Sequence, residues 1–225
     1  MLCSHDKKFI YLKTRKTAGT SVEILFEKYC RPPSEFRESH GAHEHVSDYG
    51  VVGSRMEGGS KGDRFYNHMP ASEIRERLGP ELFDAYYKFC VVRNPFDKVV
   101  SHFWWDFGKR NLARSIATHA PFSFVRRRFA RYVAEKRGRF NDRGIFMIDG
   151  QPVVAKFIRY EALGEGIAEV CHDLGISGQQ QPLGRYKAGI RARPEAFADY
   201  YDAATEALVR EEFAWDIAHF GYTLR

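Results

Sequence analysis

Two short apolar runs, each followed by a turn and then by a helix-like pattern, constrain the fold of this chain more than any other feature. The first run, "KFIYLK" at 8–13, precedes a turn containing Gly19 and apolar residues at helical spacing over 20–30. The second, "YKFCVVR" at 87–93, precedes a proline-started helix pattern over 95–107. Short apolar runs that alternate with helices are typical of strands in βαβ units. The sequence therefore predicts an α/β domain with a central, mainly parallel sheet flanked by helices.

The rest of the chain alternates further elements with polar segments. Pro70 and Gly79 bracket a helix pattern, because proline favours the first turn of a helix and glycine its end. An Asp-Gly pair within 145–154 separates two apolar stretches and predicts a hairpin. The remaining predictions are a strand at 64–68, a helix at 161–175, one long helix or a pair at 195–221, and polar segments at 34–64 and 177–194.

Length, charge and cysteine content limit the class of protein. At 225 residues the chain is expected to form a single domain over 1–225. Its net charge of +6 favours an anionic partner, such as nucleic acid, a membrane surface, or a phosphorylated or sulfated small molecule. The four cysteines form no C-x-x-C pair, so neither a zinc ribbon nor a disulfide framework is indicated. We find no signal-peptide pattern and no run of about 18 apolar residues, and expect a cytoplasmic protein.

The turn after the first apolar run has the chemistry of an anion-binding loop. Residues 13–21 read "KTRKTAGTS", and a helix starting near Gly19 would direct several backbone N–H groups and its dipole at one point. The nucleotide-triphosphate loop is excluded, because there the lysine follows the glycine. An ordinary strand–turn–helix with Thr20 as the N-cap residue is the competing interpretation. The predicted ligand contacts are Arg15, Lys16, Thr17, Ala18, Gly19, Thr20 and Ser21.

A second junction of the same kind lies in "FCVVRNPFDKVVSHFWW" at 89–105. Arg93 ends the strand, and Ser101 lies on the helix that follows. If the two junctions are neighbours in the sheet, these side chains could hold a second anionic group. A salt-bridged arginine and an ordinary helix serine are the alternative.

Together, the two segments resemble the sulfotransferase family that uses 3′-phosphoadenosine 5′-phosphosulfate (PAPS). "RKTAGTS" is similar to the family's 5′-phosphosulfate loop, and "RNPFDKVVSHF" to its 3′-phosphate element. The likeness continues in order through "YNHMPASEI", "KFIRYEALGEGIAEVCHDLGI" and "YYDAATEALVREEFAWDIAHFGY", and looks most like short bacterial members grouped with carbohydrate sulfotransferases. It leaves 31–64 and 109–143 unmatched, and we expect 34–64 and 109–143 to be variable, acceptor-related segments.

The resemblance implies a P-loop-like fold and a role for each matched residue. Lys16 would neutralise the bridging oxygen of the phosphosulfate, with Thr20, Ser21 and the loop amides on the 5′-phosphate. The donor would leave as adenosine 3′,5′-bisphosphate, and no metal is required by this scheme. Arg93 and Ser101 would hold the 3′-phosphate. Arg185 and Lys187 would close over the same phosphate, although a plain exposed loop is equally compatible with their sequence.

His68 in "YNHMP" matches the histidine that carbohydrate members carry near the reacting oxygen, and it is the predicted general base. His102 is a competing candidate that we interpret as structural. The expected acceptor is a hydroxyl or amine of a carbohydrate, glycoconjugate or glycolipid, which leaves a peripheral membrane contact open.

Two other functions remain as alternatives. The basic stretch "RRRFAR" at 126–131 could bind nucleic acid, but it lacks a known DNA- or RNA-binding signature. A kinase-like phosphotransferase would need a GK[ST] motif and a magnesium-binding acidic pair, and neither is apparent. His40, His43 and His45 match no standard zinc spacing, so we expect a polar or acceptor-facing loop there. The oligomeric state is left open.

Overall fold

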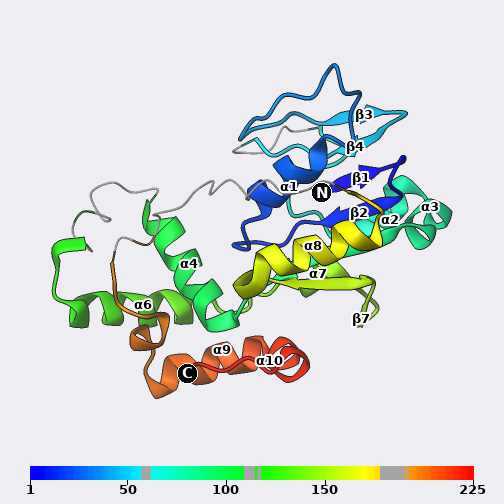
Figure 1. Cartoon of the computed structure of the whole chain (residues 1–225). Coiled ribbons are helices and arrows are strands. Elements are labelled where there is room, and N and C mark those ends of the chain that lie inside the picture. Colours follow the sequence, from blue (N-terminus) through cyan, green and yellow to red (C-terminus); the bar gives the residue numbers. More distant parts are fainter. Residues whose placement is uncertain (57–61, 109–114, 116–117, 178–190, 192) are drawn as a thin grey trace. The chain divides into compact units, whose positions relative to one another are not determined.

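The computed structural model describes the chain except for residues 57–61, 109–114, 116–117, 178–190 and 192 (Figure 1). The chain forms two compact units, each made of two separate segments. The first consists of Met1–Val92 and Asp142–Tyr186, and the second of Arg93–Asn141 and Lys187–Arg225. The chain therefore leaves the first unit after Val92 and returns to it at Asp142, and the segment Arg93–Asn141 between them belongs to the second unit.

A six-stranded sheet forms the centre of the first unit. Across the sheet the order is β3 (His45–Ser47), β4 (Gly50–Val52), β1 (Leu2–Ser4), β2 (Phe9–Leu12), β5 (Tyr87–Val92) and β8 (Lys156–Arg159). Only the β2–β5 and β5–β8 pairs are parallel, whereas the other three pairs are antiparallel. The α/β class is confirmed, but the prediction of a mainly parallel sheet is wrong. Short turns join β1 to β2 and β3 to β4, and such turns reverse the chain direction.

Both faces of the central strands are buried. Phe9, Tyr11, Phe89 and Val91 pack in one cluster with apolar side chains of α1 (Gly19–Glu27) and α8 (Leu163–Asp173). The alternate residues of the same strands, Ile10, Leu12 and Cys90, are also fully buried. Burial on both faces explains why these strands read as continuous apolar runs rather than as alternating patterns.

The elements around the sheet confirm several predictions and correct two. The remaining helices of this unit are α2 (Ala71–Leu78), α3 (Pro80–Ala85), the single-turn η1 (Tyr160–Ala162) and the short α7 (Arg143–Phe146). The predicted hairpin is formed by β6 (Met147–Ile148) and β7 (Gln151–Pro152), around Asp149 and Gly150 with φ of 52° and 75°. The strand predicted at 64–68 is reduced to an isolated bridge between Ser54 and Tyr66. The segment 34–64, predicted to be a surface loop, contributes β3 and β4.

The second unit is helical among its described residues. It contains α4 (Pro95–Gly108), α6 (Phe122–Lys136), the short η2 (Phe197–Tyr200), α9 (Ala203–Glu212) and α10 (Ala214–Phe220). Its core gathers aromatic side chains, among which the Trp104 indole N–H donates to the Tyr200 hydroxyl at 3.1 Å. The last two helices confirm the predicted helix pair. Within the described ranges, no helix is long and apolar enough to cross a bilayer.

Candidate functional site

The loop between β2 and α1 has an unusual backbone. Lys16 and Ala18 adopt left-handed conformations, with φ of 61° and 57°, whereas Thr17 between them does not. An alternation of this kind turns successive N–H groups toward one side and forms an anion-binding concavity. Ala18 is the N-cap residue of α1 and makes no side-chain cap, so the alternative in which Thr20 caps the helix is wrong.

Five successive backbone amides, from Thr17 to Ser21, lead from this loop into the first turn of α1. Within the described residues, none of the backbone N–H groups from Thr17 to Ser21 has a hydrogen-bond acceptor. The helical ladder begins with the Val22 N–H, which donates to the Ala18 carbonyl at 3.2 Å. The first N–H groups of an α-helix have no intrahelical acceptor, so they are available to a ligand or to water. Five successive amides at one helix start therefore favour an anionic ligand at this position.

Two buried threonines hold the loop against the sheet. The Thr14 hydroxyl donates to the Val91 carbonyl at the end of β5, and it accepts from the Thr17 hydroxyl at 2.8 Å. Thr17 is fully buried. Its side chain therefore holds the loop in place.

A buried ion pair lies beneath the loop. Lys13 Nζ is 2.5 Å from Glu23 Oε2, and both side chains are almost completely inaccessible. Burial alone raises the pKa of Glu23, but nearby positive charges, chiefly Lys13, outweigh it and lower that pKa to about 2. A Cβ atom on Gly19 would lie 2.8 Å from Cγ and Cε of Lys13, which explains why glycine occupies the start of α1. Sequence analysis left Lys13 without a role.

His68 lies against the end of β2. Its Nδ1 is 3.0 Å from the Lys13 carbonyl oxygen, and because that oxygen can only accept, Nδ1 carries the proton. In the neutral ring the lone pair is then on Nε2. Burial, followed by the charge of Lys13, lowers the pKa of His68 to about 4, so the ring is neutral at physiological pH. This arrangement leaves Nε2 able to accept a proton.

Backbone strain is concentrated around this loop. His68 has a φ of 61°, and three of the five non-glycine residues with positive φ in the described chain are Lys16, Ala18 and His68. Such conformations persist only where the surrounding structure enforces them, and they occur preferentially at functional sites. The coincidence of three of them marks this loop and His68 as the candidate site of the first unit.

Arg15 was also predicted to contact a ligand. Its Nε is 2.8 Å from Oδ1 of Asp142, which is buried, while the arginine side chain itself is 39% exposed. Its backbone N–H donates to Oδ2 of the same carboxylate at 2.7 Å. Asp142 thus joins the loop to a part of the chain that sequence analysis did not connect with it.

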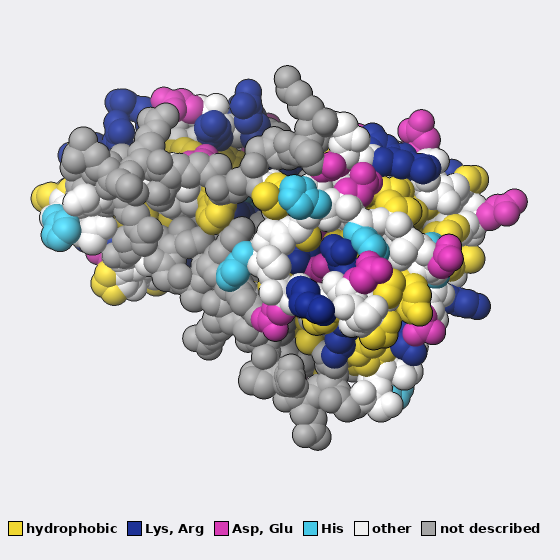
Figure 2. Space-filling view, turned by 90° about the horizontal axis from the view of Figure 1, so that it is seen from above, with side chains coloured by type: hydrophobic (Ala, Val, Ile, Leu, Met, Phe, Trp, Pro, Cys, Tyr) yellow, Lys and Arg dark blue, Asp and Glu magenta, His cyan; other side chains and the backbone are white. Residues whose placement is uncertain are grey.

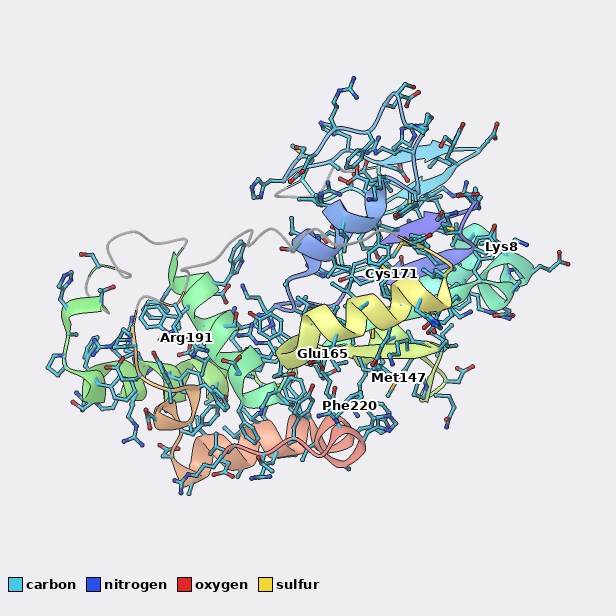
Figure 3. All side chains as sticks on the ribbon, viewed as in Figure 1. Lys8, Met147, Glu165, Cys171, Arg191 and Phe220 are labelled. Atoms are coloured by element: carbon cyan, nitrogen blue, oxygen red, sulfur yellow. The ribbon has the colours of Figure 1, made fainter. Side chains whose placement is uncertain are left out.

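The residues predicted for the 3′-phosphate belong to the second unit. Arg93 Nη2 lies 2.6 Å from Asp97 Oδ2, so the salt bridge considered as an alternative is present. Arg191, which is labelled in Figure 3, pairs with the other oxygen of Asp97. Two guanidinium groups thus share one carboxylate at the start of α4. Ser101 is half-buried on α4, and a ligand role for Arg93 and Ser101 stays a prediction.

Arg185 and Lys187 lie outside the described residues. Sequence analysis did not single out Arg191, which lies in the same basic segment. The other histidine candidate, His102, packs against Phe140 in the second unit, with ring centroids 5.7 Å apart. No group of three potential metal ligands occurs in the described part of the chain.

The histidine-rich segment near β3 has structural contacts of its own. Oxygens of Glu44 accept the N–H groups of Arg64 and Phe65 at 3.1 and 2.6 Å. His45 Nε2 lies 3.8 Å from Glu35 Oε2. Figure 2 shows histidine side chains apart from one another on the face that it views.

Comparison with known proteins identifies one archaeal relative. An uncharacterized protein of Archaeoglobus fulgidus is 34% identical over 110 residues, which cover 48% of this chain and 83% of the archaeal protein. No family model matches the chain, and no solved structure matches it significantly. With this identity and coverage, the chain belongs to the same family as the A. fulgidus protein.

Proposed function

We propose that the protein is a sulfotransferase, with a P-loop-like fold, that moves a sulfuryl group from PAPS to a hydroxyl or amine of a carbohydrate-containing acceptor in the cytoplasm. One observation carries the proposal. The backbone amides of Thr17 to Ser21 have no hydrogen-bond acceptor among the described residues, and the nearby carbonyl of Lys13, directly after β2, accepts a hydrogen bond from the neutral ring of His68. A site for an anionic leaving group and a proton acceptor are therefore attached to the same strand end. The resemblance of the loop to the family's 5′-phosphosulfate loop supports PAPS as the anion.

In the proposed reaction, the acceptor oxygen attacks sulfur in line with the bond to the bridging oxygen. The new O–S bond forms as the old S–O bond breaks, and adenosine 3′,5′-bisphosphate leaves with the electron pair. Nε2 of His68 takes the acceptor's proton. Such transfers depend on positioning and electrostatics more than on covalent catalysis.

The loop would stabilise the charge that develops on the leaving group. Amide groups that are already oriented need no reorganisation as the charge grows, so they favour the transition state. In the proposal, Lys16 neutralises the bridging oxygen, and the hydroxyl groups of Thr20 and Ser21 add donors to the 5′-phosphate.

A base with a pKa near 4 is weak for this chemistry, but the donor is itself anionic. Negative charge bound at the loop would favour the protonated imidazole and so raise the pKa of His68 toward its ordinary value. Donor binding would thus increase the basicity of His68 at the moment when the acceptor must lose its proton.

Arg93 and Ser101 remain the residues that the resemblance assigns to the 3′-phosphate. Arg93 and Arg191 both pair with the carboxylate of Asp97, which gathers two guanidinium groups at the start of α4. Ser101 would add a hydroxyl donor from α4.

Calorimetric titration with adenosine 3′,5′-bisphosphate tests the proposal without knowledge of the acceptor. We expect saturable binding to a single site in the presence of a chelator, and weaker binding in Lys16→Ala. The matched control is Arg127→Ala, which removes a cation from the exposed face of α6. Absence of binding by the wild type would rule out PAPS as the donor. Steeply salt-dependent binding of DNA or RNA in its place would favour the nucleic-acid alternative.

A further inference from the structure

Asp142 precedes α7 but does not cap it. Aspartate at an N-cap position normally accepts an N–H of the first helical turn. Here Asp142 occupies the N-cap position of α7, and its side chain makes no such bond. Only its backbone carbonyl serves the helix, by accepting the Ile145 N–H at 2.7 Å. The carboxylate therefore has another structural purpose.

That carboxylate contacts Arg15 through both of its oxygens. Oδ2 accepts the Arg15 backbone N–H at 2.7 Å, and Oδ1 lies 2.8 Å from Arg15 Nε. The two residues are 127 positions apart in sequence. Arg15 directly precedes Lys16, the first left-handed residue of the loop. Asp142 thus fixes both the backbone and the side chain at the point where the loop leaves the strand.

The carboxylate is almost completely buried, with 1% of its side chain accessible. A buried carboxylate requires hydrogen bonds and a counter-charge, and Arg15 supplies both. The charge of Asp142 also favours the protonated form of His68, although burial and Lys13 have larger and opposite effects on that pKa. Asp142 is therefore an electrostatic neighbour of the base as well as a contact of the loop.

We propose that Asp142 is a positioning residue of the anion site: by holding Arg15, it orients the loop so that the amides of Thr17 to Ser21 converge on one anion. The inference rests on the proposed function for the identity of the anion. Whatever the anion is, the inference adds Asp142, the residue at which the chain returns to the first unit, to the anion site.

The direction in which anion affinity changes when Asp142 is neutralised distinguishes a positioning role from mere closeness to the anion. A carboxylate near an anion site repels the anion, so neutralising a carboxylate that is merely close would tighten binding. Neutralising one that orients the loop would weaken binding, because the amides would no longer converge. Asp142→Asn keeps the size of the side chain and removes its charge, so it tests the two effects against each other.

The experiment titrates wild type and Asp142→Asn with adenosine 3′,5′-bisphosphate and, separately, with inorganic pyrophosphate. We expect both ligands to bind about 10- to 100-fold more weakly to the variant, the loss typical of one charge-assisted hydrogen bond. Arg15→Ala should weaken binding as well, and Asp142→Asn should add little in that background, because the two residues act as one unit. Unchanged or tighter binding by Asp142→Asn would overturn the proposal.

Asp202→Asn is the matched control. Asp202 caps α9 and accepts the Thr205 N–H at 2.8 Å in the second unit, so its loss costs a comparable local bond. We expect ligand affinity and the NMR titration midpoint of His68 to be unchanged in this variant. In Asp142→Asn the midpoint should fall, because a charge that favours the imidazolium is lost. A rise of the midpoint toward 6.5 in Asp142→Asn would indicate that the packing around His68 has loosened, and it would contradict the proposal.

The two ligands also separate this inference from the proposed function. If the wild type binds pyrophosphate but not the bisphosphate, PAPS is excluded, while the effect of Asp142→Asn on pyrophosphate still decides the role of Asp142. If the wild type binds the bisphosphate and Asp142→Asn binds it equally well, only the positioning role is wrong. Binding of neither ligand by the wild type contradicts both.

Discussion

The protonation state of His68 can be predicted from the structure and measured without any ligand. Burial and the charge of Lys13 lower the pKa of His68 to about 4 from an ordinary value of 6.5. In the unfolded chain the ring takes up a proton as the pH falls below about 6.5, but in the folded protein only near pH 4. The contribution of the neutral His68 ring to the free energy of unfolding is therefore fully present above pH 6.5, and it is lost as the pH falls toward 4.

The size of this effect follows from the difference between the two pKa values. Proton linkage converts it into ~3 kcal/mol of stability lost over the full range, and about 2 kcal/mol by pH ~5. His68→Asn removes the titrating group, and asparagine tolerates the left-handed backbone that position 68 requires. Effects of the other histidines cancel, because wild type and variant share them.

The assay is urea unfolding of wild type and His68→Asn at about pH 7.5 and pH 5, in one ionic strength. The wild type should lose about 2 kcal/mol more than the variant between these conditions. An NMR titration should show a midpoint for His68 near 4, with the proton of the neutral ring on Nδ1. Equal losses in the two proteins, or a midpoint near 6.5, would refute the reasoning.

Three further predictions concern the loop and the second unit. Glu23→Ala should cost about 3–5 kcal/mol in urea unfolding, because it removes the carboxylate that pairs with two buried cations, Lys13 and the N-terminal ammonium; a cost below ~1 kcal/mol would contradict the ion-pair account. Gly19→Ala should cost about 1–3 kcal/mol in the same assay, since the added Cβ would lie 2.8 Å from the Lys13 side chain; a neutral result would mean that this side chain can move away. Arg93→Ala should weaken calorimetric binding of adenosine 3′,5′-bisphosphate about 10- to 100-fold while sparing adenosine 5′-monophosphate; equal losses for both would exclude a 3′-phosphate contact.

The central elements of the fold could be predicted because their signals are local. The apolar runs of β2 and β5 and the helical spacing of α1 are properties of a few adjacent residues. β1 and the β3–β4 hairpin were missed because strands of three residues are too short to show a pattern. Their pairing depends on distant contacts, such as the close approach of Gly50 to the Cys3 carbonyl, where a Cβ would lie 2.0 Å from the oxygen.

In the candidate site, too, features encoded by adjacent residues could be predicted, whereas features that depend on distant contacts could not. The loop amides could be predicted from the sequence, because strand–turn–helix chemistry is encoded within a short segment. His68 was selected through the family resemblance, and its role as a base stays a prediction. The left-handed Lys16 and Ala18 could not, since neither residue type favours that conformation and the surrounding contacts enforce it. Asp142 and Arg191 have no sequence signal of their own, and their roles depend on partners about ninety or more positions away.

The charge of the basic helix α6 illustrates the limit of composition. Arg127, Arg128 and Arg131 are exposed on this helix, and composition alone made nucleic acid a candidate partner. Of the three, Arg128 lies over the Phe107 ring at 5.9 Å, so part of the charged face also serves packing. Net charge therefore does not indicate where an anion would bind, and the proposal of an anion site rests on the amides of Thr17 to Ser21 instead.

The most direct test of the account is to map where adenosine 3′,5′-bisphosphate binds, by ¹H–¹⁵N NMR of the isotope-labelled protein. We predict that the largest and saturable shifts occur at the amides of Thr17 to Ser21, with a further response of the His68 ring, and that Lys16→Ala weakens all of them together. Shifts centred on α6, or no shifts at a ligand concentration that saturates known bisphosphate-binding proteins, would contradict the assignment of this loop as the donor site.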